Sequence, residues 1–205
     1  MNIIASIDVC KRCIHVKLIG IACSPRKGGN TEILVKEAMQ PAQEASWDTE
    51  LFLLSEKHVA PCDACGTCFA TGSCVIDDDM QELYQLLNEA DAVIFGSPVY
   101  FGNVSAQAKA VMDRTFALLG RRMLQDKVVG AIVATRRVGA VQARSLITSF
   151  CISHGMIVAG AGIGYGREPG DVLDGVGGAV NSTALGEARQ VGTRVVDLAE
   201  RLSKN

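Results

Sequence analysis

Short apolar runs alternate with longer amphipathic segments along the chain. The runs at 16–22, 49–54, 92–96 and 128–134 are of strand length. The run at 92–96 shows no alternation of apolar and polar positions, which is typical of a strand buried on both faces of a sheet. A further apolar run begins a fifth predicted strand at 156–159.

The segments between these runs place apolar residues at helical spacing. Helices are predicted over 31–43, 80–89, 104–119, 139–153 and 184–202. The carboxylates of Asp77, Asp78 and Asp79 precede the second of these helices, where they favour the positive end of the helix dipole. Residues 160–178 are rich in glycine and are expected to be irregular.

Strands that alternate with helices predict an α/β fold, in which a parallel sheet has helices on both faces. Five strands favour the flavodoxin-like order 2-1-3-4-5, with a ligand at the carboxyl ends of the strands, beside the switch between strands one and three. We predict one domain spanning 1–205, with an N-terminal extension at 1–15 and a compact cysteine loop at 61–75 after strand two. This order also predicts that the cysteine loop lies near the crevice.

Composition restricts the partners and the compartment. The chain has 205 residues, 48% hydrophobic and 20% charged, which suffices for a core without disulfides. The net charge is −2 and no basic face is evident, so nucleic acid is not expected as a partner. No apolar stretch is long enough to span a bilayer, and the first residues lack a basic segment. We therefore expect no membrane partner and a reducing cytoplasm.

Four of the eight cysteines lie within thirteen residues, with the spacing C-x2-C-x2-C-x5-C. They are Cys62, Cys65, Cys68 and Cys74. A [4Fe–4S] cluster needs one thiolate for each iron, and two-residue gaps allow a tight loop to supply them. Gly66 and Gly72 permit the positive φ angles of such a loop. There are three alternatives. The first is structural zinc, which usually takes two separate C-x2-C pairs; the others are disulfides and unused thiols.

Three loops are expected to face the crevice at the sheet edge. The first, 23–31, leaves a strand and enters a helix, so its N–H groups can converge on an anion. Its side chains Ser24, Arg26, Asn30 and Thr31 add donors suited to phosphate. The alternative is a polar turn that only caps the helix.

The second and third loops supply candidates for binding a flat ring. The second carries Pro98, Val99, Tyr100, Phe101, Gly102 and Asn103. It pairs aromatic side chains with exposed backbone, as an isoalloxazine ring requires, although such a pair can also belong to a core. The third carries Thr135, Arg136 and Gly139. An arginine beside the ring would stabilise its reduced, anionic form, whereas a solvated surface pair is the alternative.

The segments 24–31 and 96–105, with the four cysteines between them, resemble the NADPH-dependent FMN reductase superfamily, and in particular the iron–sulfur flavoproteins of anaerobic archaea and bacteria. The resemblance implies FMN, with its phosphate on Ser24, Arg26, Asn30 and Thr31 and its ring near the second loop. It implies a [4Fe–4S] cluster on the loop cysteines. It also implies a homodimer or homotetramer, with cluster and flavin near a subunit interface.

The function expected is electron transfer through the cluster and FMN, from a ferredoxin-like donor or NAD(P)H to a small acceptor such as a quinone, oxygen or peroxide. No Ser/His/Asp set is evident, so no catalytic side chain is predicted. One alternative is an NAD(P)H-dependent FMN or quinone reductase with a structural or absent cluster. Another is a zinc-stabilised binding module. Cys10 and Cys13 fit a redox dithiol, a metal half-site or an inert pair.

Overall fold

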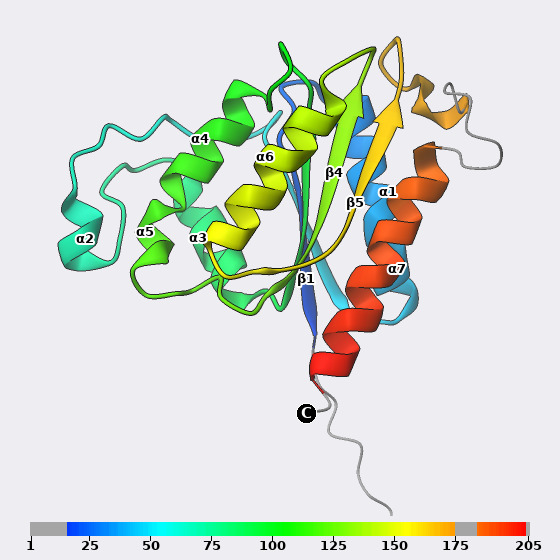
Figure 1. Ribbon diagram of the computed structural model, residues 1–205. Helices are drawn as coiled ribbons and strands as arrows, with labels where there is room; N and C mark the ends of the chain where they lie inside the picture. The colour runs from blue at the N-terminus through cyan, green and yellow to red at the C-terminus, as the bar shows by residue number, and fades with distance from the viewer. Residues whose placement is uncertain (1–15, 175–183, 204–205) are drawn as a thin grey trace, which may run out of the picture.

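A computed structural model describes residues 16–174 and 184–203 (Figure 1). The sheet of the described residues has five parallel strands in the order β2-β1-β3-β4-β5. The strands are β1 (Lys17–Ala22), β2 (Asp48–Leu53), β3 (Ala92–Pro98), β4 (Val128–Thr135) and β5 (Ile157–Tyr165). The flavodoxin-like order predicted from the alternating pattern is confirmed.

Helices cover both faces of this sheet. They are α1 (Asn30–Glu44), α2 (Thr67–Thr71), α3 (Met80–Glu89), α4 (Ala106–Arg114), α5 (Phe116–Leu119), α6 (Ala140–Ser153) and α7 (Ala184–Leu202), with a 3-10 turn at Asp171–Asp174. Residues of α1 and α7 form one apolar core with the sheet, and residues of α3, α4 and α6 form the other. No helix in the described ranges is long and apolar enough to cross a membrane.

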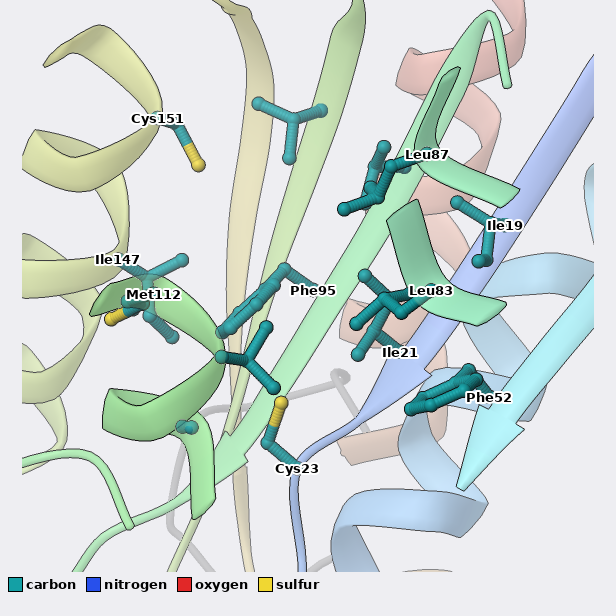
Figure 2. Close-up of a cluster of buried hydrophobic side chains, with 14 of the residues drawn as sticks. Ile19, Ile21, Cys23, Phe52, Leu83, Leu87, Phe95, Met112, Ile147 and Cys151 are labelled. Atoms are coloured by element: carbon teal, nitrogen blue, oxygen red, sulfur yellow. The ribbon is translucent and has the colours of Figure 1, made fainter. Parts of the chain in front are cut away.

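The second core includes two cysteines that point into it (Figure 2). Cys23 follows β1 and Cys151 lies on α6, and both are buried among side chains such as Phe95 and Ile147. Burial raises the pKa of the Cys23 thiol, and raises that of Cys151 to about 12. Both thiols therefore stay protonated and serve as small apolar groups.

Two predicted elements were wrong. The single helix expected over 104–119 is interrupted at Thr115, whose hydroxyl donates a 2.7 Å hydrogen bond to the carbonyl of Met112 and also contacts His154. The fifth strand continues to Tyr165 instead of becoming irregular after 159. Its glycines allow close packing, since a Cβ on Gly164 would lie 2.4 Å from Cδ1 of Leu34 on α1.

The predicted N-terminal extension, with Cys10 and Cys13, lies outside the described residues, as does the 175–178 part of the glycine-rich segment. The division of the chain into a single domain with this extension stays a prediction.

Candidate functional site

A cavity of about 320 Å³ lies at the carboxyl ends of β1, β3 and β4. Nine of the predicted cofactor-binding residues line it: Ser24, Arg26, Asn30, Thr31, Pro98, Val99, Tyr100, Thr135 and Arg136. The topology thus brings all three predicted loops to one crevice at the switch point of the sheet.

The N-terminus of α1 borders this cavity. The first hydrogen bond within the helix joins the N–H of Ile33 to the carbonyl of Gly29 at 3.1 Å, so the N–H groups of residues 30–32 have no acceptor inside the helix. The Ser24 hydroxyl accepts a hydrogen bond from the Arg26 N–H at 3.1 Å and shapes the turn before the helix. The positive helix end and the exposed Arg26 together favour an anion here.

Asn30 holds the opposite rim of the cavity. Its amide group donates to the carbonyl of Glu168 at 3.0 Å and to the carboxylate of Asp171 at 3.1 Å. Its oxygen accepts from the N–H of Gly170 at 2.6 Å. The side chain predicted to touch a phosphate therefore has three partners in the chain and positions the rim.

That rim contributes lining residues that the sequence analysis missed. They are Gly166, Arg167, Glu168 and Pro169. They directly follow β5, and the carboxyl ends of parallel strands meet at one edge of the sheet. Recognition of 160–165 as a strand would have placed them at the crevice.

Four predicted residues, Phe101, Gly102, Asn103 and Gly139, do not line the cavity. Tyr100 and Asn103 exchange backbone hydrogen bonds, and the two residues between them have φ angles of 50° and 74°, as in a type I′ turn. The side chain of Phe101 is fully exposed. A Cβ on Gly139 would lie 2.6 Å from the Cα of Gly102, so Gly139 allows the loops after β3 and β4 to touch.

Two buried serines lock the base of these loops. The Ser105 hydroxyl donates to the carbonyl of Cys23 at 2.6 Å and accepts from the N–H of Ala108, which caps α4. The Ser97 hydroxyl accepts from the N–H of Ser105 at 3.1 Å. The loops after β1 and β3 are thereby held in a fixed relation to α4.

A second cavity, of about 480 Å³, is lined by all four loop cysteines together with residues of α4, α5 and α6. Cys62 and Cys65 are exposed, Cys68 and Cys74 are half-buried, and each is a free thiol, so the disulfide alternative is wrong for these four. The φ angles of Gly66 and Gly72, 75° and 71°, are positive as predicted. Within the described ranges, no three His, Cys, Asp or Glu side chains are gathered as ligands of a single metal ion.

A buried ion pair closes the base of the cysteine loop. Arg114, at the end of α4, donates to both carboxylate oxygens of Asp78, at 2.7 and 3.0 Å. Burial alone would raise the pKa of Asp78, but hydrogen bonds from Arg114 and from the N–H groups of Ala60 and Met80 outweigh it, and the pKa lies below its ordinary value. Asp78 therefore remains charged at neutral pH.

No residue of the described ranges lines both cavities. Helix α2 packs beside α5, at one side of the molecule and away from the carboxyl ends of β3 and β4 (Figure 1). Helix α4 starts near the first cavity, after Ser105, and ends at the second with Arg114, about 13 Å further along its axis for nine residues. The cysteine loop therefore lines a cavity of its own, separate from the switch-point crevice near which it was expected.

Comparisons with known proteins show the family of this chain. The NADPH-dependent FMN reductase family matches residues 16–167. An iron–sulfur flavoprotein of Methanocaldococcus jannaschii is 39% identical over 199 residues, 92% of this chain and 100% of that protein. A flavone reductase structure has a TM-score of 0.72 at 15% identity, covering 92% of this chain and 64% of that one. A WrbA-like flavodoxin from Agrobacterium tumefaciens has a TM-score of 0.60 at 19% identity, covering 91% and 97%. These two structures share the fold.

Proposed function

Because the chain belongs to the NADPH-dependent FMN reductase family, and within it to the iron–sulfur flavoproteins, we propose that it binds FMN and a [4Fe–4S] cluster and passes electrons between them. It is a flavin-dependent oxidoreductase by family. The observation that carries the proposal is that one chain holds a four-cysteine cavity and a separate cavity at a helix N-terminus. When bound, FMN exchanges two electrons and the cluster one at a time.

In the proposed FMN site, the N–H groups at the start of α1 bind the phosphate, with Ser24, Arg26 and Thr31 beside them. Pro98 and Tyr100 form a wall for the ring. Asn30 acts through the rim that it holds. The lining of the cavity by these side chains and the positive helix end support this assignment.

In the proposed cluster site, Cys62, Cys65, Cys68 and Cys74 are the ligands. Four cysteines line one cavity, and four cysteine thiolates are the donor set that a [4Fe–4S] cluster would take. The apolar side chains beside them, among which are Phe116 and Ala117, would keep water from the sulfurs.

The proposed electron donor is a ferredoxin-like protein or NAD(P)H, and the acceptor a quinone, oxygen or peroxide, in the cytoplasm. We also propose a homodimer or homotetramer that brings the cluster of one chain close to the FMN of another. Exposed apolar side chains beside the cysteine cavity support an interface: Phe69 is 77% exposed, Val75 59% and Phe116 40%.

A visible absorption spectrum of the anaerobically purified protein, with iron, sulfide, zinc and flavin assays, tests both sites. We expect about four irons per chain together with one FMN. Cys68→Ser should lose iron and keep FMN, whereas Cys151→Ala, a change to a buried thiol of the core, should keep both. A retained cluster in Cys68→Ser would contradict the ligand assignment. Zinc in place of iron in a colourless protein would favour the binding module.

The second candidate is an NAD(P)H-dependent FMN or quinone reductase. The matched family and the partly exposed Tyr100 at the cavity favour it, since a nicotinamide could stack from that side. Rapid bleaching of the flavin by NADPH in Cys68→Ser, at the rate of the unchanged protein, would favour this reductase. A loss of turnover with the cluster would favour the electron-transfer function.

A further inference from the structure

The guanidinium group of Arg114 joins the two ends of the cysteine loop. Its Nη1 donates to the carbonyl of Ala60 at 3.0 Å, two residues before Cys62. Its Nη2 is 3.3 Å from the carbonyl of Ile76, two residues after Cys74. Together with the two hydrogen bonds to Asp78, these contacts use both terminal nitrogens on protein acceptors.

Within the part of the chain that the structure describes, the third nitrogen, Nε, has no hydrogen-bond partner. The hydroxyl of Tyr84, which also interacts with the guanidinium group, donates to the carbonyl of Arg114 at 2.7 Å. Arg114 is 2% exposed, and its Nε is a buried donor without a hydrogen-bond partner. Buried donors on charged groups are nearly always satisfied, so an orphan calls for an acceptor that binds there. Arg114 also lines the cavity of the four cysteines, which is where such an acceptor would sit.

Sulfur is the acceptor chemistry that this cavity would supply. Cluster sulfides and cysteine thiolates carry negative charge and accept hydrogen bonds, and these bonds tune the reduction potential. A reduced cluster carries one more negative charge than an oxidised one. A buried cation that donates to its sulfur therefore stabilises the reduced form.

We propose that the Nε–H of Arg114 donates a hydrogen bond to a sulfur of the bound cluster, and that Arg114 is a positioning residue that holds the loop and raises the cluster's reduction potential. The inference rests on the proposed cluster site. It assigns two functions to one residue: the terminal nitrogens hold the two ends of the loop, and the remaining Nε–H is left to donate to the cluster.

The direct test uses the intact protein labelled with arginine that carries ¹⁵N only at Nε. Pulsed electron paramagnetic resonance of the reduced cluster should detect a ¹⁵N coupling, and the coupling should vanish in Arg114→Lys. A reduced cluster without this coupling in the unchanged protein would overturn the inference. A protein without iron and sulfide would instead overturn the proposed function, so the two failures are distinguishable.

The second test is a redox titration of the cluster. Arg114→Lys keeps the charge but lacks Nε–H, and we expect its reduction equilibrium to fall at least tenfold, or about 59 mV for one electron. Arg121→Lys is the matched control, because Arg121 donates to the carbonyl of Thr71 on the exposed side of the same loop. A shift no larger than that of Arg121→Lys would overturn the inference. If Arg114→Lys does not assemble a cluster, the ¹⁵N coupling measured in the unchanged protein is the test of the inference.

Discussion

At the scale of single residues, Gly139 allows two loops beside the proposed FMN cavity to touch. Its φ is 92°, and a Cβ there would lie 2.6 Å from the backbone of Gly102. Gly139→Ala should therefore lower the free energy of unfolding by about 2–4 kcal/mol, from backbone strain and overpacking together. Urea unfolding measures this loss.

Gly170→Ala is the matched control for that prediction. Its φ is 93°, and no atom of the described residues lies within 4 Å of the added Cβ. Gly170→Ala should therefore lower the free energy of unfolding only through backbone strain, by about 1–2 kcal/mol. Equal losses in the two variants would show that contact between the loops does not matter.

Asp78 gives the molecule an acid-sensitive ion pair. Its pKa in the folded state lies below the ordinary value of 3.8, so its stabilising effect is complete above that pH and is lost progressively as the pH falls toward the lowered pKa. Asp78→Asn leaves Arg114 buried without its partner and should cost about 3–5 kcal/mol at pH 7. Urea unfolding between pH 7 and pH 3 should show a flatter profile in the variant.

The neighbouring Asp79→Asn is the control. The Asp79 side chain is 38% exposed, and its ion pair with Lys57 is long, at 3.8 Å. Neutralising Asp79 should therefore cost less than about 1 kcal/mol of stability. A pH profile of Asp78→Asn that parallels that of the unchanged protein would show that other carboxylates govern the acid response.

At the scale of elements, α1 and the segment after β5 are joined by the side chain of Asn30. Asn30→Ala removes three hydrogen bonds, worth about 1 kcal/mol each. Amide hydrogen exchange of residues 166–171 should accelerate about 10–100-fold, and the dissociation constant of FMN should rise about tenfold. Asn88→Ala, at an exposed position on α3, should change neither. If amide hydrogen exchange of residues 166–171 is unchanged in Asn30→Ala, Asn30 does not hold this rim of the cavity.

The elements also show how far the sequence predicts this fold. Short apolar runs such as 92–96 and 128–134 favour the centre of a parallel sheet, and these strands and their order were predicted correctly. The break at Thr115 was not, because helical spacing continues across it and the interruption depends on the tertiary contact with His154. The second half of β5 was missed because its glycines interrupt the apolar pattern. These glycines allow the close approach of α1 and α7, which the sequence does not reveal.

For the candidate sites too, one part could be predicted from the sequence and another could not. The three loops reach one cavity because parallel strands end at one edge, which follows from the order of elements alone. The position of the cysteine loop does not follow from it, since the long connection from β2 to α2 can extend in several directions. The contacts of Arg114 and the packing of α2 on α5 decide that position, and both form only in the folded chain.

At the scale of the whole molecule, the two cavities are separated along α4. In the proposed assembly, a second chain approaches the cysteine side, so electron transfer between the proposed cluster and FMN crosses the interface between chains. Phe69 is the side chain best placed to mediate this contact: it is 77% exposed and packs edge-on against Phe116, with the ring centroids 4.8 Å apart. Such an aromatic pair offers a rigid apolar surface for an interface.

Phe69→Asp should therefore weaken self-association. Because Phe69 also lines the cysteine cavity, the iron and FMN contents of the variant are assayed alongside. Sedimentation velocity should show a shift toward monomers, while the iron and FMN contents stay unchanged. FMN reduction through a previously reduced cluster should slow at least about tenfold, because electron transfer would now depend on encounters between chains. Leu202→Asp is the control, since Leu202 is 42% exposed and lies at the end of α7, far from α2 (Figure 1). Monomers that retain rapid transfer would instead require a path within one chain, along α4, and the proposed assembly would lose its function in electron transfer.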